Sequence, residues 1–387
     1  MTPHVDHTLA VSIKPGGFME SQSGIQRLQP RIFCRLVGSG DIGAPTFVLV
    51  HPTSNFHNHY LIEPLVRRGA NLLLVNTRYI GNDSMLLMER AIQDLGAGIR
   101  ALREAGYRDV TLVGNSGGGS LAALYQEQAE SLTIRDTPDG VALDLQRDDL
   151  PPVERIALSC AHPGRAEQLL AKIDPAVLDE HNPDLSDPEL DMYAPRNIPP
   201  YAPDWVQRYR AAQAARLARI ETWVLARLEE LTSRRDAEAA DEAFVIHRTQ
   251  ADPRLLDLSI DGNDRKPGTI QGNARHANAA SNGLARFCTL RSFLSQWSPR
   301  YTRANGPSCL ARTSVPVLVV NHTADQTTFP SHIDAWMQAA GQRARRYNLK
   351  GAPHYADDRP DLVEELADVL FAWTRDVTGA RLESAVR

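Results

Sequence analysis

A serine flanked by glycines is the residue around which this sequence could carry out chemistry. Residues 114–118 read Gly-Asn-Ser-Gly-Gly, which fits the pattern Gly-x-Ser-x-Gly. A serine at the tip of a sharp strand-to-helix turn has a strained backbone, and it needs small residues two positions away so that strand and helix pass closely. Gly114 and Gly118 occupy those positions. An ordinary glycine-rich turn with a bystander serine shows the same letters, so the surrounding sequence must decide.

Candidate partners for Ser116 follow later in the chain. A serine hydroxyl is a weak nucleophile at neutral pH, so it needs a nearby base and a carboxylate that orients this base. Asp325 comes five residues after the apolar run at 315–320, and His354 follows the last predicted strand. Eleven other histidines compete with His354, but none lies so near the end of the predicted core. Three further carboxylates are alternatives for the acid: Asp334, Asp357 and Asp358.

Strand and helix patterns alternate around these residues. An edge strand is predicted at 31–37 and buried or short strands at 46–50, 71–75, 110–113, 155–159, 315–320 and 346–350. Helical patterns separate most of them, at about 60–68, 88–105, 121–124, 333–340 and 360–373. Apolar runs without alternation are typical of parallel strands that are covered on both faces. The sequence therefore predicts an α/β fold with a mostly parallel central sheet flanked by helices.

The alternation stops between the strand at 155–159 and the strand at 315–320. The aromatic residues Trp205, Tyr209 and Trp223 recur there near helical spacing. Such a stripe belongs to a core more often than to a pocket, so lining of an apolar acyl pocket is the less favoured alternative. The predicted domain organisation is an N-terminal arm or leader strand at 1–30, a core at 31–164 and 306–387, and a mainly helical cap at 165–305, inserted over the carboxyl ends of the strands.

Over roughly residues 31–164 and 306–387 the chain resembles the α/β-hydrolase superfamily. The resemblance rests on the Gly-x-Ser-x-Gly segment, on Ala324-Asp325 after an apolar strand, and on Gly-Ala-Pro-His at 351–354. It implies that Ser116 is the nucleophile, Asp325 the orienting acid and His354 the general base. The resemblance does not assign the cap to a subfamily.

The same chemistry needs two N–H donors that stabilise the developing oxyanion. Gly117, directly after the serine, is predicted to supply one of them. The other should come from the loop after the strand at 46–50, where many family members have His-Gly. This chain has His51-Pro52 instead, and proline offers no N–H. Thr53 is therefore the predicted donor and Ser54 the alternative, while His51 is a candidate substrate contact.

Composition and charge exclude other classes of protein. The 387 residues contain 42 Lys and Arg and 47 Asp and Glu, mixed along the chain, which predicts no nucleic-acid partner and no membrane partner. His57 and His59 could share a metal ion, but no carboxylate or third histidine lies beside them at a characteristic spacing. We therefore predict no metal and no cofactor. Four cysteines without a Cys-x-x-Cys pair, and an N-terminal sequence unlike a signal peptide, favour the cytoplasm.

The expected function is hydrolysis of a carboxylic ester or lactone of a small to medium, partly apolar substrate through an acyl-enzyme. A carbon–carbon bond hydrolase or an acyltransferase on the same scaffold is the nearest alternative. A non-catalytic ligand-binding protein with a hydrolase-like fold is the alternative from another class. The expected partner is a small-molecule substrate, and the sequence leaves open whether the protein forms a homodimer.

Overall fold

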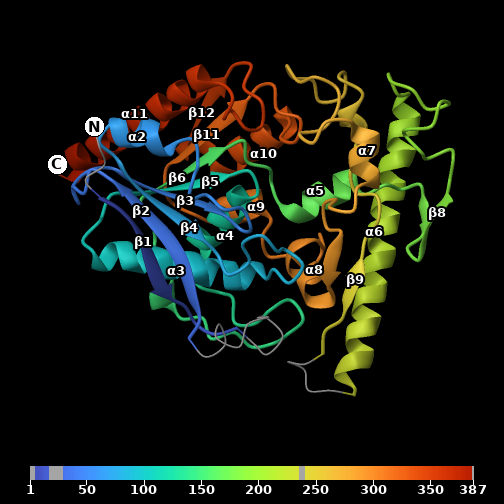
Figure 1. The fold of residues 1–387 in the computed structure, drawn as a ribbon, viewed down its shortest axis with the longest axis horizontal. Coiled ribbons are helices and arrows are strands. Elements are labelled where there is room, and N and C mark those ends of the chain that lie inside the picture. Colours follow the sequence, from blue (N-terminus) through green and yellow to red (C-terminus); the bar gives the residue numbers. More distant parts are fainter. Residues whose placement is uncertain (1–4, 17–28, 235–239, 386–387) are drawn as a thin grey trace.

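The computed structural model describes residues 5–16, 29–234 and 240–385, and a central sheet lies between layers of helices (Figure 1). In these ranges the sheet has eight strands, in the order β1-β2-β4-β3-β5-β6-β11-β12. Strand β2 is antiparallel to both of its neighbours, and the other pairs are parallel. The strands are β1 (Val5–Ser12), β2 (Arg31–Gly38), β3 (Thr46–His51), β4 (Asn71–Asn76), β5 (Val110–Asn115), β6 (Arg155–Ser159), β11 (Val317–His322) and β12 (Ala344–Leu349). The predicted fold class, α/β with a mostly parallel sheet, is confirmed.

Strand β1 lies within residues 1–30, for which the sequence predicted either a leader strand or an arm. It pairs antiparallel with β2, so residues 5–12 extend the sheet instead of forming a separate arm. Residues 17–28 of that segment lie outside the described residues. The sequence gives no clear strand signal here because β1 is at the edge of the sheet. Its side chains are exposed or half-buried there, so no continuous apolar run is needed.

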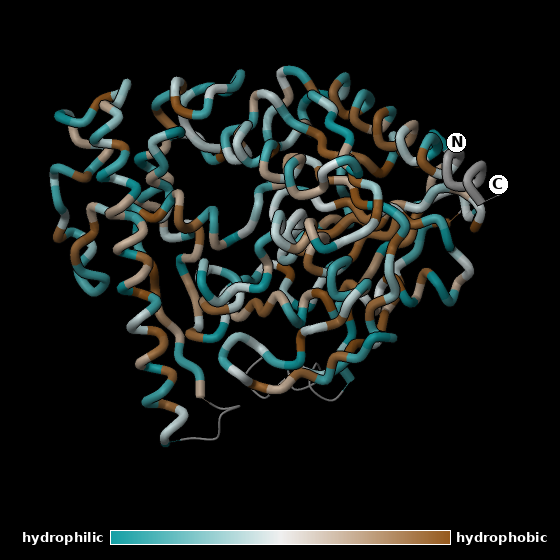
Figure 2. Tube along the Cα trace, turned by 180° about the vertical axis from the view of Figure 1, so that it is seen from behind, coloured by the Kyte–Doolittle hydropathy of each residue, from teal (hydrophilic) through white to brown (hydrophobic). Residues whose placement is uncertain are grey.

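Two hydrophobic clusters cover the two faces of the sheet. Alternate residues of β3 divide between them, with Val48 and Val50 in one cluster and Phe47 and Leu49 in the other, which explains its unbroken apolar run. The first cluster includes α3 (Met88–Glu104), α4 (Gly118–Glu130), α9 (Gly306–Leu310) and α10 (Pro330–Ala340). The second includes α2 (Ile62–Arg67) and α11 (Pro360–Ala385). Figure 2 shows the hydrophobic segments gathered where the strands lie.

The segment between β6 and β11 lies to one side of the sheet, with α6 and β8 on the side away from it (Figure 1). Strand β7 pairs with β8 and β10 with β9, separately from the main sheet. Residues 165–305 of this segment form α5 (Arg165–Lys172), β7 (Val177–Asp179), β8 (Asn182–Ser186), α6 (Pro203–Thr232), β9 (Ala243–Val245), α7 (Ala274–Ala279), β10 (Phe287–Thr289) and α8 (Leu290–Gln296), whereas α9 packs against the sheet. A short 3-10 turn lies within this segment at Pro253–Leu255, and two others lie outside it at Arg147–Asp149 and Gly341–Arg343. The segment packs around hydrophobic clusters of its own, as expected for an insertion. Its description as a cap stays a proposal.

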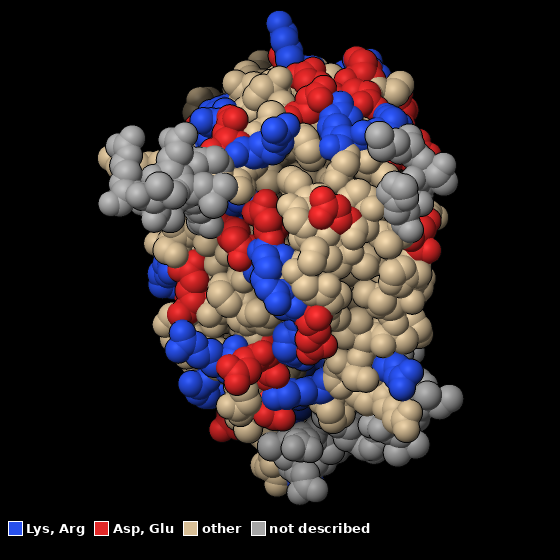
Figure 3. Space-filling view, turned by 90° about the vertical axis from the view of Figure 1, so that its left-hand side faces the viewer, with Lys and Arg blue, Asp and Glu red and all other residues tan. Residues whose placement is uncertain are grey.

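No helix among the described residues is long and apolar enough to cross a membrane. On the face drawn in Figure 3, acidic and basic side chains lie among one another.

Candidate active site

Ser116 stands on the sharp turn between β5 and α4. Its φ of 53° lies in the left-handed region, which is the strained conformation expected from the glycine pattern. A Cβ at Gly118 would lie 2.0 Å from the carbonyl oxygen of Val50, and one at Gly114 would lie 2.7 Å from the Cα of Gly119. Both positions therefore need glycine so that β3, β5 and α4 can approach one another.

This close approach leads to a prediction for Gly118→Ala. The added methyl group must push β3 and α4 apart, and overpacking of this kind costs about 3 kcal/mol. We expect the free energy of unfolding, measured by urea denaturation, to fall by about this amount. Gly43→Ala is the matched control, because a Cβ there would meet only the Asp41 side chain, at 3.3 Å. Equal stability of the two variants would contradict the packing argument.

A buried chain of hydrogen bonds links Ser116 to His354 and Asp325. The Nε2 of His354 lies 2.9 Å from the Oγ of Ser116, and its Nδ1 lies 2.7 Å from the Oδ2 of Asp325. Asp325 follows β11 and His354 follows β12, so the parallel strands bring both residues to the edge of the sheet where β5 ends. The backbone N–H groups of Thr327 and Thr328 donate to the Oδ1 of Asp325, at 2.6 and 3.0 Å.

The electrostatic environment within this chain of hydrogen bonds keeps the Asp325 carboxylate ionised. Complete burial alone would raise the pKa of Asp325. The charge of His354, its hydrogen bond and the two backbone donors outweigh burial and hold this pKa below its usual value. Among the alternative acids, Asp334 forms an ion pair with Arg346 at 3.2 Å, and Asp357 and Asp358 are exposed. Only Asp325 of these four is hydrogen-bonded to His354 in the described structure.

The loop after β3 does not place the backbone donors as predicted. The N–H groups of Thr53 and Ser54 both donate to the Nδ1 of His51, at 3.1 and 2.9 Å. Burial, with the nearby charges of Arg165 and His354, lowers the pKa of His51 to about 3, so its ring is neutral. Because Nδ1 accepts these hydrogen bonds, the ring proton is on Nε2. A Cβ at Gly117 would lie 2.9 Å from that nitrogen.

The strand order, with an antiparallel second strand, and a strained serine at the end of β5 settle the architecture. The chain has the α/β-hydrolase fold. Neither a protein-family model nor a curated protein matches the sequence.

Solved structures of hydrolases overlay on nearly the whole chain at low sequence identity. The esterase domain from a Rhodothermus marinus protein is 13% identical, with 96% of this chain and 98% of that chain covered and a TM-score of 0.46. An α/β fold family hydrolase from Bacillus anthracis strain Sterne is 14% identical, with 96% and 99% covered and a TM-score of 0.44. An esterase from Exiguobacterium antarcticum is 13% identical, with 95% and 100% covered and a TM-score of 0.43.

A cavity of about 510 Å³ opens beside Ser116 and His354. Core loops and the segment between β6 and β11 line it together. The prediction of a partly apolar substrate is matched by only a few lining side chains in the described structure, namely Ile270, Leu284 and Phe287. Most of the other lining residues are polar or charged.

The predicted aromatic pocket residues lie elsewhere. Trp205 packs between Tyr201 and Tyr209, with ring centroids 4.7 Å apart on both sides, in a small core of the inserted segment. Trp223 is 39% exposed and contacts Phe244 beside a separate cavity. The helical spacing of these aromatic residues reflects how α6 packs within the inserted segment. Of the candidate substrate contacts, only His51 lines the cavity beside Ser116.

The histidine pair His57 and His59 does not line the cavity beside Ser116. The Nε2 of His57 lies 3.2 Å from the carbonyl oxygen of Phe33, and the Nδ1 of His59 accepts the N–H of Leu61 at 3.2 Å. These contacts give both rings structural roles.

Possible metal ligands do meet at the site itself. One ligand atom each from Cys160, Asp325 and His354 lies within 4.8 Å of the others. Both ring nitrogens of His354 are already engaged, one by Ser116 and one by Asp325. Burial also raises the pKa of Cys160 well above its usual value, which disfavours the thiolate that a metal requires. The donor set therefore fits the hydrogen-bond chain better than a metal ion.

Sequence reasoning missed the polar residues that α5 contributes to the cavity. Arg165, Gln168 and Lys172 all line it, and their spacing of three and four places them on one face of this helix. This spacing directly after β6 was a usable signal, because α5 starts where the strands of the sheet end.

Proposed function

We propose that this protein is a serine hydrolase that cleaves a carboxylic ester or lactone of a small to medium substrate. The observation that carries the proposal is the buried hydrogen-bond chain from Ser116 through His354 to Asp325, beside an open cavity. Its geometry matches what nucleophilic catalysis by a serine needs: a base within reach of the hydroxyl, and a carboxylate that orients the base.

In the proposed reaction the Oγ of Ser116 attacks the carbonyl carbon and the Nε2 of His354 takes its proton. Asp325 accepts the hydrogen bond from Nδ1, which keeps Nε2 free to act as the base and stabilises the charged imidazolium. His354 then donates the proton to the leaving alcohol, and an acyl-enzyme on Ser116 remains. A water molecule, activated by the same imidazole, attacks the acyl carbonyl and releases the acid.

The oxyanion of the tetrahedral intermediate would be stabilised by the N–H of Gly117 and the Nε2–H of His51. Gly117 precedes the first turn of α4, where backbone N–H groups have no helical acceptor. His51 replaces Thr53 in this role, because the Thr53 N–H is already donated to the ring. In this view the two amides of the loop hold the imidazole, and the imidazole supplies the donor.

His51→Asn tests this assignment. The asparagine Oδ1 can replace Nδ1 as the acceptor for the two amides, whereas the Nε2–H is lost. Removal of one oxyanion donor lowers kcat by about 10²- to 10³-fold, so we expect a loss of that size for p-nitrophenyl ester hydrolysis with little change in KM. His57→Asn, in a half-buried histidine of the same loop that does not line the cavity, should keep the activity of the parent. A kcat for His51→Asn within twofold of the parent would refute the role of His51.

The proposed function itself is tested with a fluorophosphonate probe and a panel of p-nitrophenyl esters and lactones. We expect one covalent label, located on Ser116 by mass spectrometry, together with ester or lactone turnover. Labelling without turnover of any ester or lactone would favour the carbon–carbon hydrolase or the acyltransferase. Absence of both would favour the non-catalytic ligand-binding protein.

A further inference from the structure

The cavity beside Ser116 carries an excess of positive charge. Arg165, Lys172 and Arg286 line it, and Asp83 is the sole carboxylate among its described lining residues. Asp83 forms an ion pair with Arg165. Lys172 and Arg286 form no ion pair with any carboxylate in the part of the chain that the structure describes. This differs from the outer face in Figure 3, where the two signs are interspersed.

Lys172 is the more unusual of these two cations. It ends α5 and is only 5% exposed, yet its ammonium group makes no hydrogen bond and no ion pair with a described residue. Burial lowers the pKa of Lys172 to about 8, which still leaves the amine mostly charged at neutral pH. A buried charge without a partner costs free energy, and a ligand of opposite charge bound in the cavity would offset this cost.

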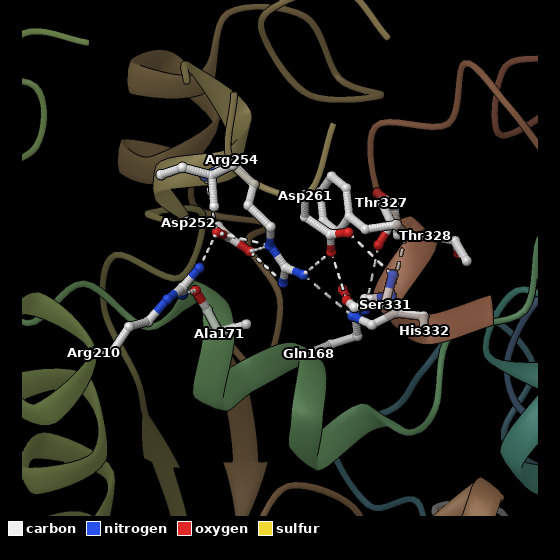
Figure 4. Close-up of polar contacts among 12 residues, drawn as sticks. Gln168, Ala171, Arg210, Asp252, Arg254, Asp261, Thr327, Thr328, Ser331 and His332 are labelled. Atoms are coloured by element: carbon white, nitrogen blue, oxygen red, sulfur yellow. Dashed lines mark hydrogen bonds and ion pairs between the residues drawn. The ribbon is translucent and has the colours of Figure 1, made fainter. Parts of the chain in front are cut away.

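The nearest structural explanation, an ion pair with Asp252, does not hold. Although burial alone would raise the pKa of Asp252, the charges and hydrogen bonds of Arg254 and Arg210 lower it. Figure 4 shows the Asp252 carboxylate between these two guanidinium groups, beside α5. Arg210 donates to its Oδ1 at 2.6 Å, and Arg254 donates to its Oδ2 at 2.8 Å. Two arginines therefore already bind this carboxylate, and Lys172 forms no ion pair with it in the described structure.

Arg286 adds a second cation without a counter-ion. It is 7% exposed, and its guanidinium donates to the Nδ1 of His247 at 2.8 Å and to the carbonyl oxygen of Ala280 at 2.6 Å. Both acceptors are uncharged groups. The backbone carbonyl carries no net charge, and the His247 ring is neutral because burial and the charge of Arg286 lower its pKa. The contacts fix the direction of the side chain without balancing its charge.

We infer that the substrate bears a carboxylate, which binds at Lys172 and is further attracted by Arg286 while the ester carbonyl lies at Ser116. The inference rests on the proposed function and adds the substrate class to it: an ester whose acyl or alcohol part carries a free acid. One unpaired ammonium in the cavity matches one negative charge, and a charge-assisted hydrogen bond to it is stronger than a neutral one.

Pairs of substrates that differ only in this charge test the inference on the parent protein. On the acyl side, p-nitrophenyl hemiesters of succinate, glutarate and adipate are compared with their methyl esters. On the alcohol side, 4-acetoxybenzoate is compared with methyl 4-acetoxybenzoate. We expect the acid of at least one pair to exceed its methyl ester by about tenfold or more in kcat/KM, mainly through KM. Ratios at or below one in every pair would overturn the inference.

Variants then assign the preference to Lys172. In Lys172→Met the ratio of acid to methyl ester should fall to near one, whereas Lys350→Met, in an exposed lysine outside the cavity, should keep the ratio of the parent. Lys172→Met should also keep or raise the Tm, because it removes a buried unpaired charge. A ratio that survives in Lys172→Met would overturn the role of this residue, and so would a clear fall in its Tm.

A binding measurement separates failure of this inference from failure of the proposed function. Ser116→Ala protein is titrated with monomethyl glutarate and with dimethyl glutarate by calorimetry. Tighter binding of the acid, lost in the double variant with Lys172→Met, supports the anion site even if no ester is turned over. Turnover of neutral esters without tighter binding of the acid would leave the hydrolase standing and overturn the anion site.

Discussion

Ser116→Ala is expected to lower kcat/KM for ester hydrolysis by about 10⁴- to 10⁶-fold and to abolish fluorophosphonate labelling. The reason is geometric as well as chemical. The Ser116 Oγ lies 2.9 Å from the His354 Nε2, on a turn where the φ of Ser116 is a strained 53°. No neighbouring hydroxyl has this relation to His354 in the described structure. The measurement is steady-state hydrolysis of the best p-nitrophenyl ester, with labelling followed by mass spectrometry.

Ser120→Ala is the matched control for this prediction. Ser120 is also buried and lies in the first turn of α4, but its Oγ contacts only the Gly117 carbonyl oxygen, at 3.5 Å. We expect this variant to keep its label and to change kcat/KM by less than about threefold. Retention of more than a hundredth of the parent activity in Ser116→Ala would show that another nucleophile performs the reaction.

Asp325→Asn is expected to lower kcat by about 10⁴-fold while the protein stays folded. The two oxygens of Asp325 have different partners, and this decides how an asparagine would lie. Because the N–H groups of Thr327 and Thr328 point at Oδ1, the asparagine oxygen takes that place and its NH₂ faces His354. The imidazole then accepts at Nδ1 and carries its proton on Nε2, where it cannot take the proton of Ser116.

The variant Asp334→Asn controls for the loss of a negative charge near the same strand. Asp334 lies on α10 and pairs with Arg346 at the surface, so its replacement should leave kcat unchanged. Both variants are measured from pH 5 to 9. The pKa of Asp325 lies below its usual value, so this carboxylate is ionised throughout the range, and the Asp325→Asn defect should persist at every pH. Recovery of the activity at high pH would contradict a locked tautomer.

Much of the fold could be predicted because a parallel sheet leaves a strong sequence signal. Strands such as β3 and β4 are covered on both faces and must be apolar throughout, so they stand out from the helices between them. Strand β1 gave no such signal, since an edge strand with exposed side chains needs neither an apolar run nor strict alternation. The short strands of the insertion were missed for the same reason.

The site could be predicted in part. The pattern around Ser116 and the loop positions of Asp325 and His354 follow from local requirements, and the structure brings these three residues together. The expected donor at Thr53 was wrong in a way that only coordinates reveal, because its N–H points at its own neighbour His51. The expected pocket aromatics Trp205 and Tyr209 were indistinguishable from core residues, since a helix buries an apolar stripe wherever it packs.

What the sequence by itself determined is the set of local requirements: glycines that permit a strained serine, apolar strands that stack into a sheet, and three reactive side chains in loops after those strands. These depend on near neighbours in the chain. The tertiary structure alone decided which nitrogen of His51 is free and that Asp252 is already bound by arginines 42 residues before it and two residues after it. It also decided that Lys172 lies without an ion pair among the described residues of the cavity that Ser116 lines. Electrostatic compensation is a property of distances in space, which no spacing along the chain contains.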